Sequence, residues 1–245
     1  MENHKPYLEG FIFLILLQPE IQEGMDYGKP RKGHPEGKVF YHTLEIIEKI
    51  NGLGDTTETI FKLYILAIIH DSLKFKVDCQ KPKIGENDHG MIARRFAEKF
   101  ISDETFLSII ELHDRFYYLW RRFSRNGIFE QEEFKQTMNR VKDEMNIFLK
   151  FVLIDGATGD KSSEPRRWFL NKLVEMGYIH FSCGKETNQH SIESLLDFYL
   201  YNPQHFNNCL CRALYIFPID RFLYYATIKC YFTYISQKIY FFMFS

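Results

Sequence analysis

Histidine and aspartate residues recur along this chain at positions where a helix of a soluble protein would carry apolar residues. His70 and Asp71 follow the apolar run from Ile60 to Ile69, and further histidines stand before and after them. The order along the chain is His42, His70, Asp71, His89, His113 and Asp155. Imidazole nitrogens and carboxylate oxygens are ligands that one divalent cation can take together. The order therefore predicts the divalent-metal site of a hydrolase.

The elements that must position these residues are helices, because apolar residues recur at separations of three and four in this block. The expected stripes are Val39, His42, Ile46 and Ile50; Ile60, Tyr64, Ala67, Asp71 and Lys74; His89, Ile92, Phe96 and Phe100; Phe106, Ile109, His113, Tyr117 and Trp120; and Phe134, Met138, Val141, Met145, Phe148, Val152 and Asp155. Asn87-Asp88 and Ser102-Asp103 are N-cap candidates for the third and fourth helices. A sixth helix is expected over 166–176. Each of the first five helices thus turns a histidine or an aspartate inward.

A single histidine on an apolar stripe is more often a hydrogen-bonded core residue than a ligand. Five helices that each bury such a group are a different case, because every unsatisfied buried polar group costs several kcal/mol. A shared cation satisfies all of them, and facing helices of a bundle are a known place for such a site. The pattern as a whole therefore favours a metal centre over separate core histidines.

Composition limits the function classes. The chain has 245 residues of which 45% are hydrophobic, so one main core is expected. Its formal net charge of -1 gives no global attraction to nucleic acid or anionic membrane, and any phosphate recognition must be local. The five cysteines are odd in number and form no pair of CxxC motifs, which fits reduced thiols in a cytoplasmic protein.

Three zones follow from the composition along the chain. We expect an N-terminal extension over 1–30, a helical domain over 31–177 and an aromatic-rich C-terminal extension over 178–245, which fits a core or an interface better than contact with lipid. The short apolar run Phe11–Leu17 predicts a buried helix rather than a signal sequence. Charged residues interrupt the apolar stretch from Ala213 to Phe244, so no transmembrane segment is expected.

These residues resemble the HD-domain superfamily of metal-dependent phosphohydrolases. The matching segments are Tyr41-His42-Thr43-Leu44, His70-Asp71-Ser72-Leu73-Lys74 and the distal Asp155. His34-Pro35-Glu36-Gly37 and His113-Asp114-Arg115 are similar to the HD domain attached to some bacterial tRNA nucleotidyltransferases. The resemblance covers roughly residues 31 to 160. The chain departs from the family in one place, because its His-Asp-Ser-Leu-Lys has no glycine where a motif resembling His-Asp-x-Gly-Lys is common.

The resemblance implies an all-α HD-domain helical bundle with a metal centre. In the family, the first histidine, the His-Asp pair and the last aspartate bind one divalent metal, and here these are His42, His70, Asp71 and Asp155. In members with two metals, two further histidines bind the second ion, which here are His89 and His113, with Asp71 as the bridge. One or two divalent ions are therefore expected, and Mn, Mg, Fe, Co, Ni and Zn all remain open.

The expected reaction is hydrolysis of a phosphomonoester or phosphodiester in a nucleotide or another small phosphorylated substrate by a metal-activated water. Asp71, Lys74 and Asp114 are the candidate catalytic residues, and Lys74 and Arg115 the candidate contacts to substrate phosphate. Lys74 stands three residues after Asp71, and on a continuing helix it would project to the same side. Asp114 adjoins His113, so we expect it to point elsewhere and to orient a ligand. Two alternatives remain open: a di-iron oxygenase of the inositol-oxygenase type, and a non-catalytic module that senses a nucleotide.

Overall fold

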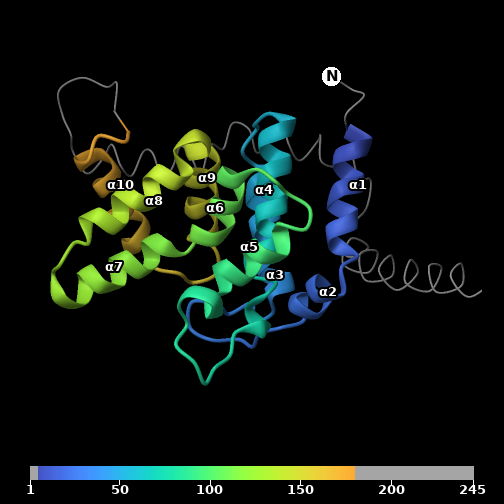
Figure 1. Cartoon of the computed structure of the whole chain (residues 1–245), viewed down its shortest axis with the longest axis horizontal. Coiled ribbons are helices and arrows are strands. Elements are labelled where there is room, and N and C mark those ends of the chain that lie inside the picture. The colour runs from blue at the N-terminus through green and yellow to red at the C-terminus, as the bar shows by residue number, and fades with distance from the viewer. Residues whose placement is uncertain (1–4, 180–245) are drawn as a thin grey trace, which may run out of the picture. The chain divides into compact units, whose positions relative to one another are not determined.

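The computed structural model describes residues 5–179, which belong to one compact unit, and these residues contain α-helices and short 3-10 helices but no strand (Figure 1). The α-helices are α1 (Lys5–Leu16), α2 (Pro19–Met25), α3 (Val39–Asn51), α4 (Thr57–Ile69), α5 (His89–Ala97), α6 (Glu104–Leu112), α7 (Arg115–Asn126), α8 (Gln131–Val141), α9 (Met145–Asp155) and α10 (Glu164–Glu175). The 3-10 helices are Lys74–Lys76, Gly85–Asn87 and Lys142–Glu144. The expectation of an all-α fold is confirmed for this part of the chain.

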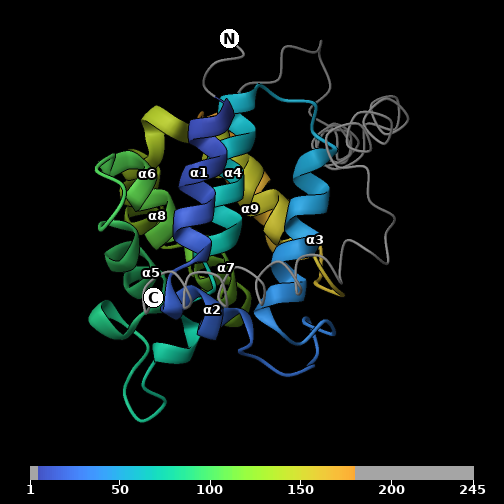
Figure 2. The ribbon, with the colours of Figure 1, turned by 90° about the vertical axis from the view of Figure 1, so that its right-hand side faces the viewer.

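Helix α4 lies at the centre of the bundle. It packs against α3, α9 and α1, while α5 packs along α6, and α6 continues the bundle to α8. Helix α7 packs against α8 and α10 on the other side of the molecule (Figures 1 and 2). The helices that carry the predicted ligands, α3 to α6 and α9, are therefore neighbours in space.

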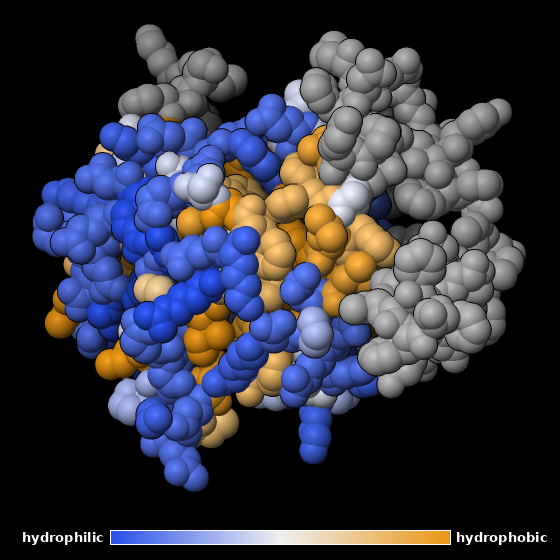
Figure 3. Space-filling model, turned by 45° about the vertical axis from the view of Figure 1, so that its right-hand side comes forward, coloured by the Kyte–Doolittle hydropathy of each residue, from blue (hydrophilic) through white to orange (hydrophobic). Residues whose placement is uncertain are grey.

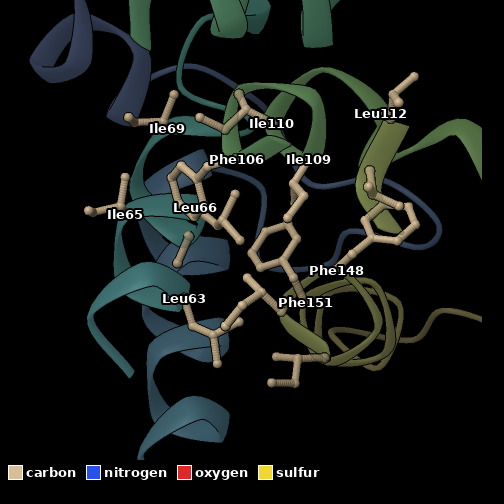
Figure 4. Close-up of a cluster of buried hydrophobic side chains, with 14 of the residues drawn as sticks. Leu63, Ile65, Leu66, Ile69, Phe106, Ile109, Ile110, Leu112, Phe148 and Phe151 are labelled. Carbon is tan, nitrogen blue, oxygen red and sulfur yellow. The ribbon is translucent and has the colours of Figure 1, made fainter. Parts of the chain in front are cut away.

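The core between these helices consists of aliphatic and aromatic side chains (Figure 4). Leu63 and Leu66 of α4, Ile109 of α6 and Phe148 and Phe151 of α9 are fully buried. Burial of one such side chain contributes about 1.5–3 kcal/mol to folding. This apolar contact between α4, α6 and α9 fixes the ends of the three helices relative to one another.

Helices α5 and α6 approach each other closely. A Cβ on Gly90 would lie only 2.2 Å from the carbonyl oxygen of Glu111, so glycine permits this contact. Asp88 caps α5 by accepting a hydrogen bond from the Gly90 amide at 2.9 Å, and Asp103 caps α6 by accepting one from the Phe106 amide at 3.0 Å. Both N-terminal boundaries predicted from the sequence are confirmed.

Two of the predicted continuous helices are broken. The stripe from Phe106 to Trp120 is divided between α6 and α7 by a turn at His113 and Asp114, and Tyr117, expected to face the core, is 44% exposed. The stripe over 134–155 is divided between α8 and α9 by the 3-10 helix Lys142–Glu144. Each break is short, so the spacing of apolar residues continues across it and conceals it in the sequence.

The third correction concerns the residues after α4. The helix ends at Ile69, with His70 as its C-cap, and Asp71 to Leu73 form a turn before the 3-10 helix Lys74–Lys76. Lys74 therefore does not continue a helix from Asp71. The turn nevertheless brings it to the same side, because its backbone amide donates to the Asp71 carbonyl at 3.0 Å.

Helices α1 and α2, from the segment predicted as an N-terminal extension, contribute to the common core. Ile15 and Ile21 are fully buried, and the predicted short helix over Phe11–Leu17 coincides with the C-terminal half of α1. Phe13 and Leu14 are 37% and 55% exposed, so that helix is only partly buried. On the face that Figure 3 presents, a band of hydrophobic residues lies open between hydrophilic regions.

The last predicted helix is confirmed as α10. Within 5–179, no helix is both long enough and apolar enough to span a membrane. The predictions for the aromatic-rich extension, including the stretch from Ala213 to Phe244, concern residues almost entirely outside the described part of the chain.

Candidate metal centre

The structure brings the predicted ligands together at helix ends. His42 lies in the first turn of α3, His70 and His113 are the C-caps of α4 and α6, His89 begins α5 and Asp155 ends α9. Asp71 follows His70 directly. All six side chains are buried.

These side chains form two groups. The first ligand group is His42, His70 and Asp155, and the second ligand group is His89 and His113; Asp71 stands between the two. In the first group, His42 Nε2 lies 3.0 Å from Asp155 Oδ1 and 3.4 Å from His70 Nε2. These distances allow one cation to be reached by all three side chains.

In the second ligand group, the Nε2 atoms of His89 and His113 lie 3.1 Å apart. The rings are nearly perpendicular, with an interplanar angle of 82° and centroids 5.0 Å apart. Both nitrogens also face Asp71, at 3.8 Å and 3.6 Å from its Oδ1 atom. This group is therefore a second place where nitrogen and oxygen donors converge.

Asp71 presents one carboxylate oxygen to each group. Its Oδ2 atom lies 3.8 Å from His42 Nε2 and 3.6 Å from His70 Nε2, whereas Oδ1 faces His89 and His113. If each group held an ion, both ions could be reached by this one carboxylate.

Hydrogen bonds on the outer side of the rings orient two of the histidines. His70 Nδ1 donates to the carbonyl oxygens of Leu66 and Ala67, each at 3.1 Å, and His113 Nδ1 donates to that of Ile110 at 2.8 Å. A carbonyl oxygen only accepts, so the proton of each neutral ring is on Nδ1 and the lone pair on Nε2 points into the site. The Nδ1 atom of His42 instead faces Glu36 Oε1 at 3.3 Å.

The donor set fits divalent cations. Asp71 Oδ1 is buried and accepts no hydrogen bond, although an unsatisfied buried carboxylate oxygen is costly. The two pairs of Nε2 atoms lie close together, His89 and His113 at 3.1 Å and His42 and His70 at 3.4 Å. A cation between these donors satisfies all of them at once, which separate core histidines would not. The residues therefore suit one or two metal ions.

The carboxylates of the centre are ionised. Burial raises the pKa of Asp71 and of Asp155, but Lys74 outweighs this at Asp71 and Lys161 at Asp155, and both pKa values fall well below the ordinary one. Lys74 Nζ lies 2.5 Å from Asp71 Oδ2, and Lys161 Nζ lies 2.9 Å from Asp155 Oδ1. Each of these two carboxylates therefore forms an ion pair with one lysine.

The histidines differ in their affinity for protons. Burial lowers the pKa of His70 to about 3. Burial also lowers the pKa of His113, but the carboxylate of Asp71, whose Oδ1 lies 3.6 Å away, and the charge of Asp114 outweigh it and raise this pKa to about 9. A metal ion must therefore displace a proton to bind His113, whereas His70 offers a free nitrogen.

Two expectations for the segment after His113 are corrected. Asp114 does not point away from the site: because the helix breaks here, its Oδ2 atom lies 3.3 Å from His89 Nε2. Its side chain is 30% exposed, so it lies at a partly open edge of the centre. Arg115 contacts no ligand and instead pairs with Glu133 of α8 at 3.2 Å.

Four residues near the ligands had no predicted role. Glu36 Oε1 lies 3.0 Å from His34 Nδ1 as well as next to His42, and the ring of Phe151 packs 5.1 Å from that of His70. Lys161 donates to both the carbonyl and the carboxylate of Asp155 at 2.9 Å. The motif His34-Pro35-Glu36-Gly37 was a signal for Glu36, but the loop composition around Lys161 gave none.

Known proteins give no further guidance to the identity of this centre: no family model, no curated protein and no solved structure matches the chain. Its function must be inferred from the residues of the site.

Proposed function

We propose that the chain is a metal-dependent phosphohydrolase of the HD type that acts on a nucleotide or another small phosphoester. The observation that carries the proposal is the central carboxylate, Asp71, whose two oxygens face two groups of histidine and aspartate donors. The ligands expected are His42, His70, Asp71 and Asp155 for one ion and Asp71, His89 and His113 for the other. When bound, such ions lower the pKa of a coordinated water and polarise a phosphoryl oxygen.

The donor chemistry narrows the choice of metal. Imidazole nitrogens make up most of both ligand groups, and imidazole suits Zn, Fe and Ni better than Mg, which prefers oxygen ligands and keeps several waters. We therefore expect Fe, Co, Ni or Zn to support activity before Mn or Mg does.

Lys74 is the proposed contact to substrate phosphate. Burial alone would lower the pKa of its amine, but the carboxylates of Asp71 and Asp114 have the larger effect and raise it above its ordinary value. The amine therefore stays charged at any physiological pH. Its side chain is 23% exposed, and it can therefore reach a bound phosphate while it contacts the bridging carboxylate. A phosphoester that enters here would meet a fixed positive charge beside the ligands.

Other residues orient the attacking water, exclude bulk water or support a ligand. Asp114, ionised and at the open edge, is placed to accept a hydrogen bond from the attacking water and orient it. Phe151 lies against His70 and His113 with ring centroids 5.1 Å and 6.4 Å away, and it keeps water from the inner side of the ligands. Glu36 supports His42 from the outer side, as second carboxylates do in many metal centres.

The test combines metal analysis with one matched pair of variants. The purified protein is loaded with Mn, Fe, Co, Ni, Zn or Mg in turn, its metal content is measured, and aryl phosphomonoesters, aryl phosphodiesters and a nucleotide panel are screened. Lys74→Met should raise the KM for the best substrate by about tenfold at unchanged metal content, as expected for the loss of one charged hydrogen bond of about 1.5 kcal/mol. Lys76→Met is the control, because Lys76 lies in the same 3-10 helix but is exposed and faces Glu20 at 3.8 Å.

Two results would contradict the proposal. Bound iron with oxygen consumption and no cleavage of any phosphoester would indicate the di-iron oxygenase instead. A fully metal-loaded protein that binds nucleotides but cleaves none of the panel would indicate a sensing module.

A further inference from the structure

Helix α7 combines a buried apolar face with an unusually basic and aromatic outer one. Phe116 and Leu119 are 3% and 1% exposed and belong to the core. The remaining positions of Arg115–Asn126 are rich in arginine, tyrosine and tryptophan: Arg115, Tyr117, Tyr118, Trp120, Arg121, Arg122 and Arg125. The proposed metal chemistry uses none of them.

The outer face of α7 presents two neighbouring aromatic rings and a guanidinium side by side. Tyr117 is 44% exposed, and its ring lies 5.7 Å from that of Trp120 at an interplanar angle of 32°. The Cζ atom of Arg121 lies 5.7 Å from the centroid of Tyr117. Residues 117, 121 and 125 are separated by four positions, so they share one face of the helix. We call Tyr117, Trp120, Arg121 and Arg125 the α7 outer face.

The arginines of α7 divide into two kinds. Arg115 and Arg122 both pair with Glu133 of α8, so their charges are compensated within the fold. Arg121 and Arg125 form no ion pair with any residue of the described part of the chain. The uncompensated positive charge therefore lies beside the exposed ring of Tyr117 and the half-buried ring of Trp120.

We propose that the α7 outer face binds single-stranded nucleic acid, with bases stacked on Tyr117 and Trp120 and phosphates bound by Arg121 and Arg125. Exposed aromatic rings beside cations are the means by which proteins bind single strands without reading their sequence, because every base has a π-face. This local charge is compatible with the formal net charge of -1, which gives the chain as a whole no attraction to polyanions. An anionic membrane fits less well, because the apolar side of α7 is buried in the core and cannot insert.

The α7 outer face begins next to the candidate metal centre. Helix α7 starts directly after Asp114, and at 1.5 Å per residue Tyr117 lies within about one turn of it. The half-buried Tyr118 is close enough to the centre to be affected by its charge. Burial raises the pKa of Tyr118 most, and the negative charge of Asp114 raises it further. A strand bound along α7 would therefore lead one of its phosphates towards the ligands. Binding itself requires no metal, so it can be tested apart from the proposed function.

The experiment measures binding of a fluorescein-labelled mixed-sequence RNA of about 15 nucleotides to the full chain by fluorescence anisotropy, in EDTA so that no cleavage occurs. Tyr117→Ala should weaken binding about tenfold, whereas Tyr117→Phe should retain it, because stacking needs the ring and not the hydroxyl. Arg121→Ala and Arg125→Ala should each weaken binding several-fold and reduce the slope of log affinity against log salt by about 0.7.

The control is Arg95→Ala on α5, which removes the same formal charge from a side chain that is 56% exposed and pairs with Glu86. It should change the affinity less than twofold. No RNA binding by the unaltered chain, or equal losses in the Arg95 and Arg121 variants, would overturn the proposal. Binding to phosphatidylcholine vesicles with one fifth phosphatidylserine that depends on Tyr117, without binding to RNA, would overturn it in favour of a membrane.

Discussion

The two ligand groups share Asp71 but differ in how the surrounding structure supports them. In the first ligand group, Glu36 lies behind His42 and Lys161 donates to Asp155. In the second ligand group, His89 begins its helix and faces Asp114, whose side chain is 30% exposed. The first group is thus enclosed by supporting side chains, whereas the second borders the open edge of the site.

This difference indicates that the two ligand groups have different functions. Ligands that are buried and held by outer hydrogen bonds lose little freedom when a cation binds, and they favour tight retention. Ligands at an open edge leave room for water and substrate beside the cation. We therefore expect the first ligand group to retain its ion and the second to exchange its ion more readily and to bind substrate.

The largest effect is expected when Asp71, which the two ligand groups share, is replaced. Asp71→Asn should eliminate both ions and reduce phosphoester hydrolysis to background, because an amide supplies only one neutral oxygen where the carboxylate supplied two oxygens that share a negative charge. The helical content should remain, since the helices of the core do not depend on this side chain. Metal analysis and circular dichroism on the same sample check both statements. One full equivalent of metal retained after dialysis would show that the groups do not depend on Asp71 as a bridge.

The next test separates the groups. His42→Ala should abolish retention of the first ion, and with it most of the second, whereas His89→Ala should leave about one equivalent bound. The reason is that His42 contacts both carboxylates expected at the first ion, Asp155 and Asp71, whereas His89 belongs to the second ligand group and contacts none of the residues of the first. Metal-to-protein ratios after dialysis give the answer. Equal losses in both variants would remove the distinction between a retained and an exchangeable ion.

A smaller effect is expected from the support of the first ligand group. Glu36→Gln replaces the carboxylate between His34 and His42 with an amide and should weaken retention of the first ion about 10–100-fold. The ion of the second group should exchange as before. Competition with a chelator measures the affinity, and Glu132→Gln on α8, whose side chain is 78% exposed, is the control. An unchanged affinity would leave Glu36 without a part in metal binding.

The sequence predicted the helices and most of the candidate ligands, but not the breaks between helices or the contacts made by loops. Polar residues on apolar stripes identified the helices that meet at the site, because burial of unpaired His70, Asp71 or Asp155 would be too costly. The breaks at His113-Asp114 and at Lys142–Glu144 were not predictable, since a one-turn break preserves helical spacing. For the same reason Asp114 was expected to point away from the centre. Lys161 was also hidden, because its contact with Asp155 depends on a loop that no periodic pattern describes.

The mildest test concerns how the fold positions the turn that carries the ligands. Gly24 of α2 lies against that turn, and a Cβ there would lie 1.6 Å from the carbonyl oxygen of Ser72. Gly24→Ala should therefore displace the backbone next to Asp71 and lower the free energy of unfolding by about 1–3 kcal/mol. Metal retention should fall mainly in the first ligand group, because His70 belongs to the same turn.

Gly10→Ala in α1 is the matched control for Gly24→Ala, since a Cβ at Gly10 meets no atom within 4 Å. Alanine there should stabilise the protein by about 0.5–1 kcal/mol, because glycine is the weaker helix former. Denaturant unfolding followed by circular dichroism measures both variants, and the chelator assay measures their metal retention. If Gly24→Ala were as stable as the unaltered chain and kept its ions, α2 would cover the ligand turn without positioning it. The enclosure of the first ligand group would then depend only on Glu36, Lys161 and the core beneath them.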